Sequence, residues 1–336
     1  MKAASRAAHR QQDERQQGTA LPLLAGKGHL IAIKRRARAA DPGAAPPGKG
    51  MGQIFQTLHT DCPLDIFGNC FLYARTRARA RENITKQKGE QMRIITTAII
   101  KGGTGKTTTA AAIAQAAAAD GKRVLCVDLD PQANFSAFIG ADRNHAGSLE
   151  LLTGAEPAAV IQETAQGLAA ITAAPDLATL TTSAGSAKRL QMALQPIKRN
   201  YDFIIIDTPP QIGELTFNAL QASTGLLIPL ESDNSSLQGL YQIADIAEQM
   251  KKSNKGLQII GTLLTRYEAR TKINKYLQEV IAEQSKQMGL PYLGEVRAGV
   301  AIREAQGLQL SLYEYAPKCK PAQDYAAIYK AIKGKG

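Results

Sequence analysis

The Gly-rich segment 101–108, KGGTGKTT, constrains the fold of this chain more than any other feature. It follows the apolar run 94–100 and precedes the Ala-rich stretch 109–119, which is the strand, loop and helix order of a P-loop. Glycines let successive backbone N–H groups curve around phosphate oxygens, and the following helix points its positive end at the same anion. We therefore predict a nucleoside triphosphate site made of Lys101, Gly102, Gly103, Thr104, Gly105, Lys106, Thr107 and Thr108.

Three carboxylates follow two other apolar runs and are candidates for the same site. Asp128 and Asp130 come after 123–127, and Asp207 comes after 203–206. Doubly wound sheets place ligands at the carboxyl ends of their strands, so these side chains should face the phosphates. In a P-loop, Lys106 would contact the β- and γ-phosphates, while Thr107 and Asp207 would hold Mg²⁺. For Asp130, turn chemistry before Pro131 is the competing interpretation.

The three motifs together resemble the ParA/MinD family of deviant Walker A P-loop ATPases. The matching segments are 101–108 (KGGTGKTT), 128–134 (DLDPQAN) and 207–210 (DTPP). The resemblance implies that Lys101 reaches the partner's nucleotide across a dimer interface, much as an arginine finger acts in trans. It also implies that Asp130 orients the attacking water, that Asp128 sits near the metal shell, and that Pro229 lies near the base. The Asn-Gln pair that often precedes the first lysine is replaced here by Ile99 and Ile100.

Within this family, the segment 263–271 (LLTRYEART) favours a ParA-type partition ATPase. The resemblance assigns DNA binding to Arg270, for which a solvated helix start is the alternative. A second DNA-contacting arginine of some relatives falls on Ala301, so Arg297 or Arg303 would have to substitute for it. The implied activity is hydrolysis of ATP with Mg²⁺ by a homodimer that forms on ATP, binds non-specific DNA and answers to a ParB-like partner.

A MinD-like ATPase that positions a membrane or protein cargo, without binding DNA, is the alternative function. Membrane targeting would require a C-terminal helix with bulky apolar residues, and the apolar side of 324–336 is small. The chain has no stretch of about 18 apolar residues and no N-terminal h-region. We therefore expect no stable membrane association and a cytoplasmic, nucleoid-associated protein. The four cysteines show no metal-binding spacing, which fits a reducing compartment.

Most of the positive charge lies outside the expected ATPase domain, 92–336. Residues 1–91 hold 16 Lys and Arg against 7 Asp and Glu, which is +9 of the net charge of +12. This basic, low-complexity extension has three interpretations: a winged-helix domain, a disordered arm that touches DNA phosphates, or a translated upstream leader. We favour the leader, because the family's usual opening would begin at Met92 and the preceding 87–91 (QKGEQ) can encode a ribosome-binding sequence.

From Met92 onward, apolar strands and amphipathic helices alternate. This alternation predicts an α/β P-loop NTPase fold, with a doubly wound, mostly parallel sheet covered by helices on both faces. We expect strands near 93–100, 123–128, 203–206, 225–230 and 257–264. We expect helices near 106–119, 186–198, 214–222, 236–251, 271–287 and 321–333.

Overall fold

The computed structural model describes residues 92–180 and 185–334. These residues lie in one compact unit, Arg79–Gly336. The interpretations of residues 1–91 fall outside the described residues and stay predictions.

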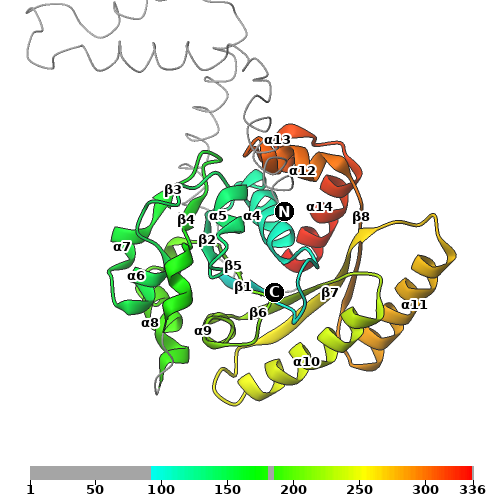
Figure 1. Ribbon diagram of the computed structural model, residues 1–336, viewed down its shortest axis with the longest axis horizontal. Coiled ribbons are helices and arrows are strands. Elements are labelled where there is room, and N and C mark those ends of the chain that lie inside the picture. The colour runs from blue at the N-terminus through cyan, green and yellow to red at the C-terminus, as the bar shows by residue number, and fades with distance from the viewer. Residues whose placement is uncertain (1–91, 181–184, 335–336) are drawn as a thin grey trace, which may run out of the picture. The chain divides into compact units, whose positions relative to one another are not determined.

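An eight-stranded sheet forms the centre of this unit, in the order β3-β4-β2-β5-β1-β6-β7-β8 (Figure 1). Within the described part of the chain, only the short β3–β4 pair is antiparallel. The predicted doubly wound, mostly parallel sheet is therefore confirmed. The strands are β1 (Arg93–Thr97), β2 (Val124–Asp128), β3 (Gln162–Glu163), β4 (Ala169–Ile171), β5 (Phe203–Asp207), β6 (Gly225–Leu230), β7 (Gln258–Tyr267) and β8 (Tyr292–Arg297).

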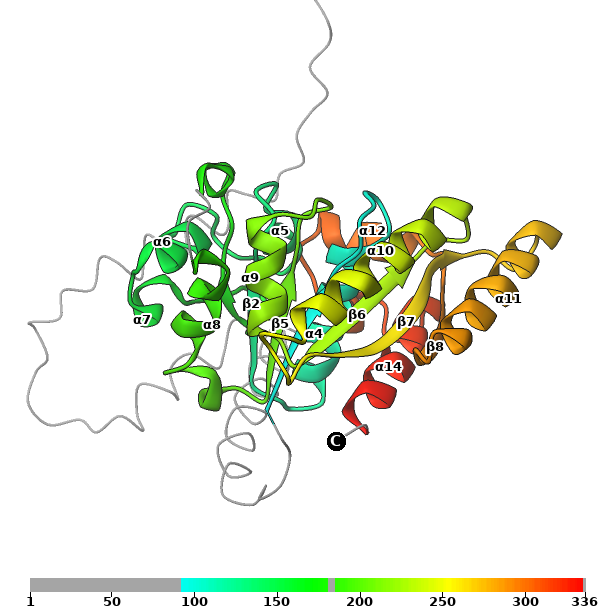
Figure 2. The same ribbon diagram turned by 90° about the horizontal axis from the view of Figure 1, so that it is seen from below.

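Helices cover both faces of the sheet. Successive side chains of a strand point to opposite faces, and both sets are apolar here, so each face is buried by helices. In β1, Ile95 packs in the cluster beneath α4 and α14, whereas its neighbour Ile94 packs in the cluster on the other face. Figure 2 shows α10 and α11 beside the β6–β7–β8 half of the sheet. The helices are α4 (Lys106–Ala119), α5 (Asn134–Phe138), α6 (Ser148–Thr153), α7 (Pro157–Val160), α8 (Arg189–Leu194), α9 (Glu214–Ala222), α10 (Asn234–Met250), α11 (Lys272–Gln287), α12 (Val300–Gly307), α13 (Leu312–Tyr315) and α14 (Lys320–Lys333), with 3₁₀ turns at Pro175–Thr179, Ser186–Lys188 and Lys198–Asn200.

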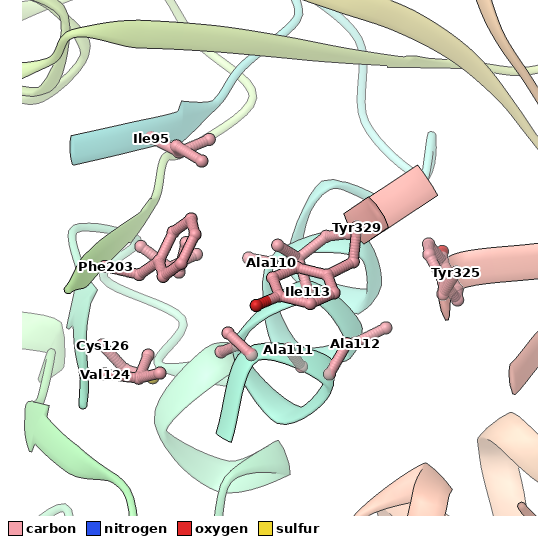
Figure 3. Packing of buried hydrophobic residues seen from close by; sticks show 14 of the residues in the cluster. Ile95, Ala110, Ala111, Ala112, Ile113, Val124, Cys126, Phe203, Tyr325 and Tyr329 are labelled. Atoms are coloured by element: carbon pink, nitrogen blue, oxygen red, sulfur yellow. The ribbon is translucent and has the colours of Figure 1, made fainter. Parts of the chain in front are cut away.

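The helix that follows the P-loop, α4, is buried between the sheet and α14. Its alanines let α14 approach closely, and Tyr329 of α14 packs against Phe203 of β5 with ring centroids 5.8 Å apart (Figure 3). The Tyr329 hydroxyl donates to Asp120, the residue that caps the carboxyl end of α4. Removing Ile113 from this cluster by substitution with alanine should cost about 2–5 kcal/mol. This packing fixes the direction of α4 and therefore the position of the P-loop, because α4 begins at Lys106 within that loop.

The sequence pattern located the long elements and missed the short ones. Strand β1 ends at Thr97, three residues before its predicted end, because the chain leaves the sheet to form the loop. The predicted helix 186–198 is divided into a 3₁₀ turn, α8 and a second 3₁₀ turn. Strands β3, β4 and β8 were not predicted, since the first two have two and three residues and β8 is mostly half-buried.

Candidate nucleotide site

The site lies where three neighbouring strands end in register. Thr97 of β1 pairs with Asp207 of β5, which in turn pairs with Asp128 of β2. The loop after β1 leaves the sheet between β5 and β6, which flank β1 on opposite sides. Parallel α/β sheets bind ligands at such a position, outside the carboxyl ends of the strands.

The P-loop takes the conformation that its glycines allow. Gly103 and Gly105 have φ values of 80° and 76°, in the left-handed region that side chains other than glycine rarely adopt. A Cβ on Gly105 would also lie 3.3 Å from the Thr265 side chain. From β7, the Thr265 hydroxyl donates to the carbonyl of Thr104 at 2.9 Å and so holds the loop from outside.

Lys106 lies folded over the loop and is buried. Its Nζ donates to the carbonyl of Lys101 at 2.9 Å. Burial lowers the pKa of Lys106, while the charges of Asp207 and Asp130 act to raise it. The Lys106 ammonium therefore lies near Asp207 and Asp130, two of the carboxylates that were predicted to face the phosphates.

Asp207 is the carboxylate best suited to a metal ion. Its side chain is fully buried, and its Oδ1 accepts a hydrogen bond from Thr97 at 3.2 Å. Its Oδ2 is buried without a partner among the described residues, as is the hydroxyl of Thr104. Burial raises the pKa of Asp207 to about 8, with a further contribution from Asp128, while the Thr107 side chain and Lys106 act in the opposite direction.

A buried, unsatisfied carboxylate oxygen is costly unless a ligand uses it. The described residues contain no group of three or more His, Cys, Asp or Glu that could hold a metal without other ligands. This donor set fits Mg²⁺, which usually keeps several waters and binds one or two carboxylates together with substrate phosphates. Asp207 and Thr107 are the residues that would hold it.

Asp128 organises the segment that follows β2. Its Oδ2 accepts from both the backbone N–H and the hydroxyl of Ser136 at 2.8 Å, and its Oδ1 accepts from the N–H of Asp130 at 3.0 Å. Burial raises its pKa to about 6, although the hydrogen bonds from Ser136 oppose this shift. Asp128 therefore positions Asp130, and its place near the metal stays a prediction.

The structure shows the turn interpretation of Asp130, and the role of Asp130 in positioning water stays a prediction. Its Oδ1 accepts from the N–H of Gln132 at 3.0 Å, which is the turn chemistry expected before Pro131. The side chain is also buried, and its charge acts on the pKa of both Lys106 and Asp207, so the three side chains lie near one another. Oδ1 is the carboxylate oxygen that the described residues engage, which leaves Oδ2 to accept from a water molecule.

Lys101 lies at the entrance of the loop and turns toward the start of α10. Its Nζ forms an ion pair with Asp233, donates to the Ser236 hydroxyl at 3.3 Å and lies 3.6 Å from the Glu231 carboxylate. The lysine is thus held by its own chain in this structure. A Cβ added to the neighbouring Gly102 would meet no atom of the described residues within 4 Å.

Pro229 lies in the sheet near the site, and Ile99 lies just beyond the end of β1. Pro229 lies in β6 beyond the point where β1 ends, so its missing N–H breaks no bond to β1. Ile99, which stands where relatives often have Asn, is buried and packs against Gly239 of α10. A contact of Pro229 with the nucleotide base stays a prediction.

The three arginines predicted to bind DNA lie in or after β7 and β8, and they differ in exposure and in their partners. Arg270 and Arg303 are exposed and form no ion pair within 92–180 and 185–334. Arg297 is instead engaged by Asp324 of α14, with nitrogen–oxygen distances of 2.8 and 2.6 Å. Arg297 therefore contributes a structural ion pair, and Arg270 and Arg303 are the more available cations.

Sequence reasoning missed the residues that support the site from other elements. They are Thr265, which holds the P-loop, Ser136 and Ser148, which hold Asp128, and Asp233, which holds Lys101. Ser, Thr and Asp next to a motif carry no distinctive spacing, so only the fold could reveal their partners.

A P-loop at the end of the central strand β1, with buried aspartates at the ends of the neighbouring β5 and of β2 beyond it, defines a P-loop NTPase. A family model described as "AAA domain" matches residues 92–259. The chain is 33% identical over 245 residues to the sporulation initiation inhibitor protein Soj of Bacillus subtilis, covering 70% of this chain and 96% of that protein. It is also 33% identical over 250 residues to the chromosome-partitioning ATPase Soj of Thermus thermophilus, covering 72% of this chain and 96% of that protein.

A solved structure agrees with these relatives. A cobyrinic acid a,c-diamide synthase of Mycobacterium smegmatis, determined with bound ADP and magnesium, is 30% identical with a TM-score of 0.61 and covers 70% of this chain and 91% of its own. The chain belongs to the ParA/MinD family of deviant Walker A ATPases, and it is an ATPase. In the part of the chain that the structure describes, no helix is long and apolar enough to cross a membrane.

Proposed function

We propose that this ATPase is a DNA partition protein that dimerises on ATP, binds DNA without sequence preference and releases it after hydrolysis. The observation that carries the proposal is a set of exposed cations in the segments that follow the carboxyl ends of β7 and β8, at the same ends of the strands as the P-loop. Arg270, Lys272 and Lys275 follow the carboxyl end of β7, and Arg303 follows the end of the adjacent β8. Within the described ranges none of the four makes an ion pair.

Cations without carboxylate partners are suited to phosphate oxygens. Each phosphate that the protein neutralises should add about −0.9 to the slope of log affinity against log salt. Backbone contacts of this kind carry no sequence information, so they support non-specific binding. A dimer would present two such surfaces together and so raise the affinity of the ATP-bound state for DNA.

The geometry of the aspartates and lysines supports the catalytic roles proposed for them. Lys106 neutralises the phosphate tail, and Asp130 positions the attacking water with its second carboxylate oxygen. Mg²⁺, held by Thr107 and Asp207, would supply charge neutralisation of the phosphates when bound. Because Asp130 is tied to Asp128 through a backbone hydrogen bond of 3.0 Å, its position depends on the segment that follows β2.

Dimerisation would bring Lys101 to the nucleotide of the partner subunit. Lys101 is one-fifth exposed at the loop entrance, and the open space at Gly102 leaves room for a second backbone. A cation supplied in trans stabilises charge on the transferring phosphoryl group. A ParB-like partner would accelerate hydrolysis, and the protein would associate with the nucleoid in the cytoplasm.

The decisive experiment measures retention of a non-specific DNA duplex with ATP, with ADP and without nucleotide. We expect retention with ATP alone, and none for Lys106→Ala, which should lose nucleotide binding. Sedimentation with anionic liposomes, run in parallel with ATP, tests the MinD-like alternative. Liposome binding without DNA retention would overturn the proposal in favour of that alternative.

A further inference from the structure

The eight-residue helix α12 lies directly against the start of the phosphate-binding helix α4. Side chains of both helices line a crevice of about 20 Å³, room for no more than one water molecule. Ala305 of α12 is buried in the same hydrophobic cluster as the alanines of α4. A displacement at the amino end of α4 would therefore act on α12 through close packing.

One side-chain hydrogen bond connects α12 to the P-loop itself. The Nε2 of Gln306 donates to the hydroxyl of Thr108, at 3.3 Å and 198 residues away in the chain. A hydroxyl that accepts one hydrogen bond still has its own hydrogen to donate, and donation is strengthened when it also accepts. Gln306 thus leaves Thr108 prepared to donate to a phosphate oxygen of the nucleotide.

The segment after α12 is anchored separately to the middle of α4. The Oε1 of Gln115 accepts from the N–H of Leu312 at 3.1 Å, and its Nε2 donates to Gln166 at 2.8 Å. Gln166 in turn donates to the carbonyl of Gln309 at 3.0 Å. These bonds hold the segment that follows α12, and Gln306, the penultimate residue of α12, is the side chain through which a change at Thr108 would reach the helix.

The side of α12 opposite the buried Ala305 faces solvent. Arg303, three residues before Gln306, is exposed, and Val300 at the first turn is 58% exposed. Side chains three residues apart on a helix are neighbours, so this short helix places the amide that contacts Thr108 next to an exposed cation. We propose that Gln306 is a positioning residue that senses an occupied phosphate site through Thr108 and transmits it to α12, and thereby to the surface that carries Arg303.

The role of Arg303 in this inference rests on the proposed DNA binding, but the coupling within the chain does not. Hydrogen–deuterium exchange of the full chain, with and without saturating slowly hydrolysed ATP analogue and Mg²⁺, measures the coupling without DNA. In the unmodified protein, nucleotide should slow exchange both at 101–108 and in α12, the latter by roughly two- to tenfold, the range of one neutral hydrogen bond.

Gln306→Leu is the test variant, because leucine keeps most of the volume and removes the amide. We expect the P-loop to remain protected by nucleotide at saturation while the nucleotide-dependent slowing in α12 disappears. The matched control is Gln323→Leu on α14, whose exposed amide donates to the Lys318 carbonyl instead. It should behave like the unmodified protein, which separates the loss of this bond from the general effect of a surface leucine.

A nucleotide effect on α12 that survives unchanged in Gln306→Leu would overturn the inference, as would its absence from the unmodified protein. If Gln306→Leu is too unstable to study, Gln306→Asn keeps the amide but shortens its reach, and the same loss of coupling is expected. If nucleotide slows exchange in α12 but DNA is not retained with ATP, the proposed DNA function is overturned and the role of Gln306 as a sensor stands. DNA retention that responds to ATP equally in the unmodified protein and in Gln306→Leu would overturn the step from α12 to the surface that carries Arg303, and would leave the DNA function standing.

Discussion

Lys101 forms an ion pair with Asp233 of its own chain, at the residue that caps the amino end of α10. Although partial burial acts to raise it, hydrogen bonds from Lys101, Ser235 and Ser236 hold the pKa of Asp233 at about 2. Asp233 therefore stays charged at neutral pH. If Lys101 must reach the nucleotide of a partner, this pair has to open first.

Asp233→Asn should accordingly favour the ATP-bound dimer. Asparagine keeps the helix cap but removes the charge that competes for Lys101. A partly exposed ion pair contributes about 0.2–1 kcal/mol and each dimer opens two of them, so the dimer should form at a roughly 2- to 30-fold lower protein concentration. Sedimentation velocity with ATP, in an Asp130→Ala background, measures the shift. Unchanged or weaker association would show that Asp233 does not compete for the lysine.

Gly102→Val should block dimerisation without harming the single chain. A Cβ at Gly102 meets no atom within 4 Å, so stability should change by less than about 0.5 kcal/mol and nucleotide binding should persist. The control is Gly105→Ala, which is strained by its φ of 76° and by the Thr265 side chain at 3.3 Å. That variant should lose about 1 kcal/mol and bind nucleotide poorly. Normal ATP-dependent dimerisation of Gly102→Val would contradict the proposed interface.

Asp130→Ala should reduce ATP hydrolysis by roughly 10²-fold or more while ATP binding persists, because the water-positioning carboxylate is lost. Single-turnover hydrolysis and fluorescent nucleotide binding measure the two effects. Asp130→Asn separates this role from turn formation, since its amide oxygen can still accept from the N–H of Gln132. Hydrolysis at the normal rate in Asp130→Asn would mean that the residue serves the turn alone.

The unusual pKa of Asp207 predicts a pH-dependent stability of the nucleotide-free protein. Its pKa of about 8 lies above the value of an unfolded chain, so the folded protein binds the extra proton between these two values. The stabilising contribution of that proton is complete at low pH and is lost as pH rises toward about 8.

Asp207→Asn should remove this dependence. In the presence of a chelator, the variant should have a higher melting temperature than the unmodified protein, by a larger margin at pH 8 than at pH 5. It should also lose Mg²⁺-dependent hydrolysis. Removing a buried charge that serves function commonly stabilises a protein while it reduces activity. An equal margin at both pH values would contradict the assignment of the raised pKa to Asp207.

Arg270→Ala should weaken DNA retention uniformly across sequences and reduce the salt slope by about 0.9, with basal hydrolysis largely intact. Arg297→Ala is the comparison, because its guanidinium is already paired with Asp324. We expect the second variant to affect stability more than DNA affinity. A salt slope that falls for Arg297→Ala but not for Arg270→Ala would reverse the assignment of the two arginines.

Contiguous motifs were predicted well, because their residues shape the backbone where they stand. The left-handed glycines of the P-loop and the fully apolar strands before Asp128 and Asp207 needed no distant information. The order of these elements along the chain was enough to place the nucleotide site at the carboxyl ends of a parallel sheet.

Side-chain partners, in contrast, depended on packing across the whole domain. Thr265 meets the P-loop from 161 residues away, Lys101 meets Asp233 from 132 and Gln306 meets Thr108 from 198. Which cations stay available, such as Arg270 rather than Arg297, depended on where α14 places Asp324. The local backbone conformation is set by neighbouring residues and can be predicted from a short motif. The pairing of polar side chains depends on how helices and strands pack together, and the spacing of residues along the chain does not reveal it.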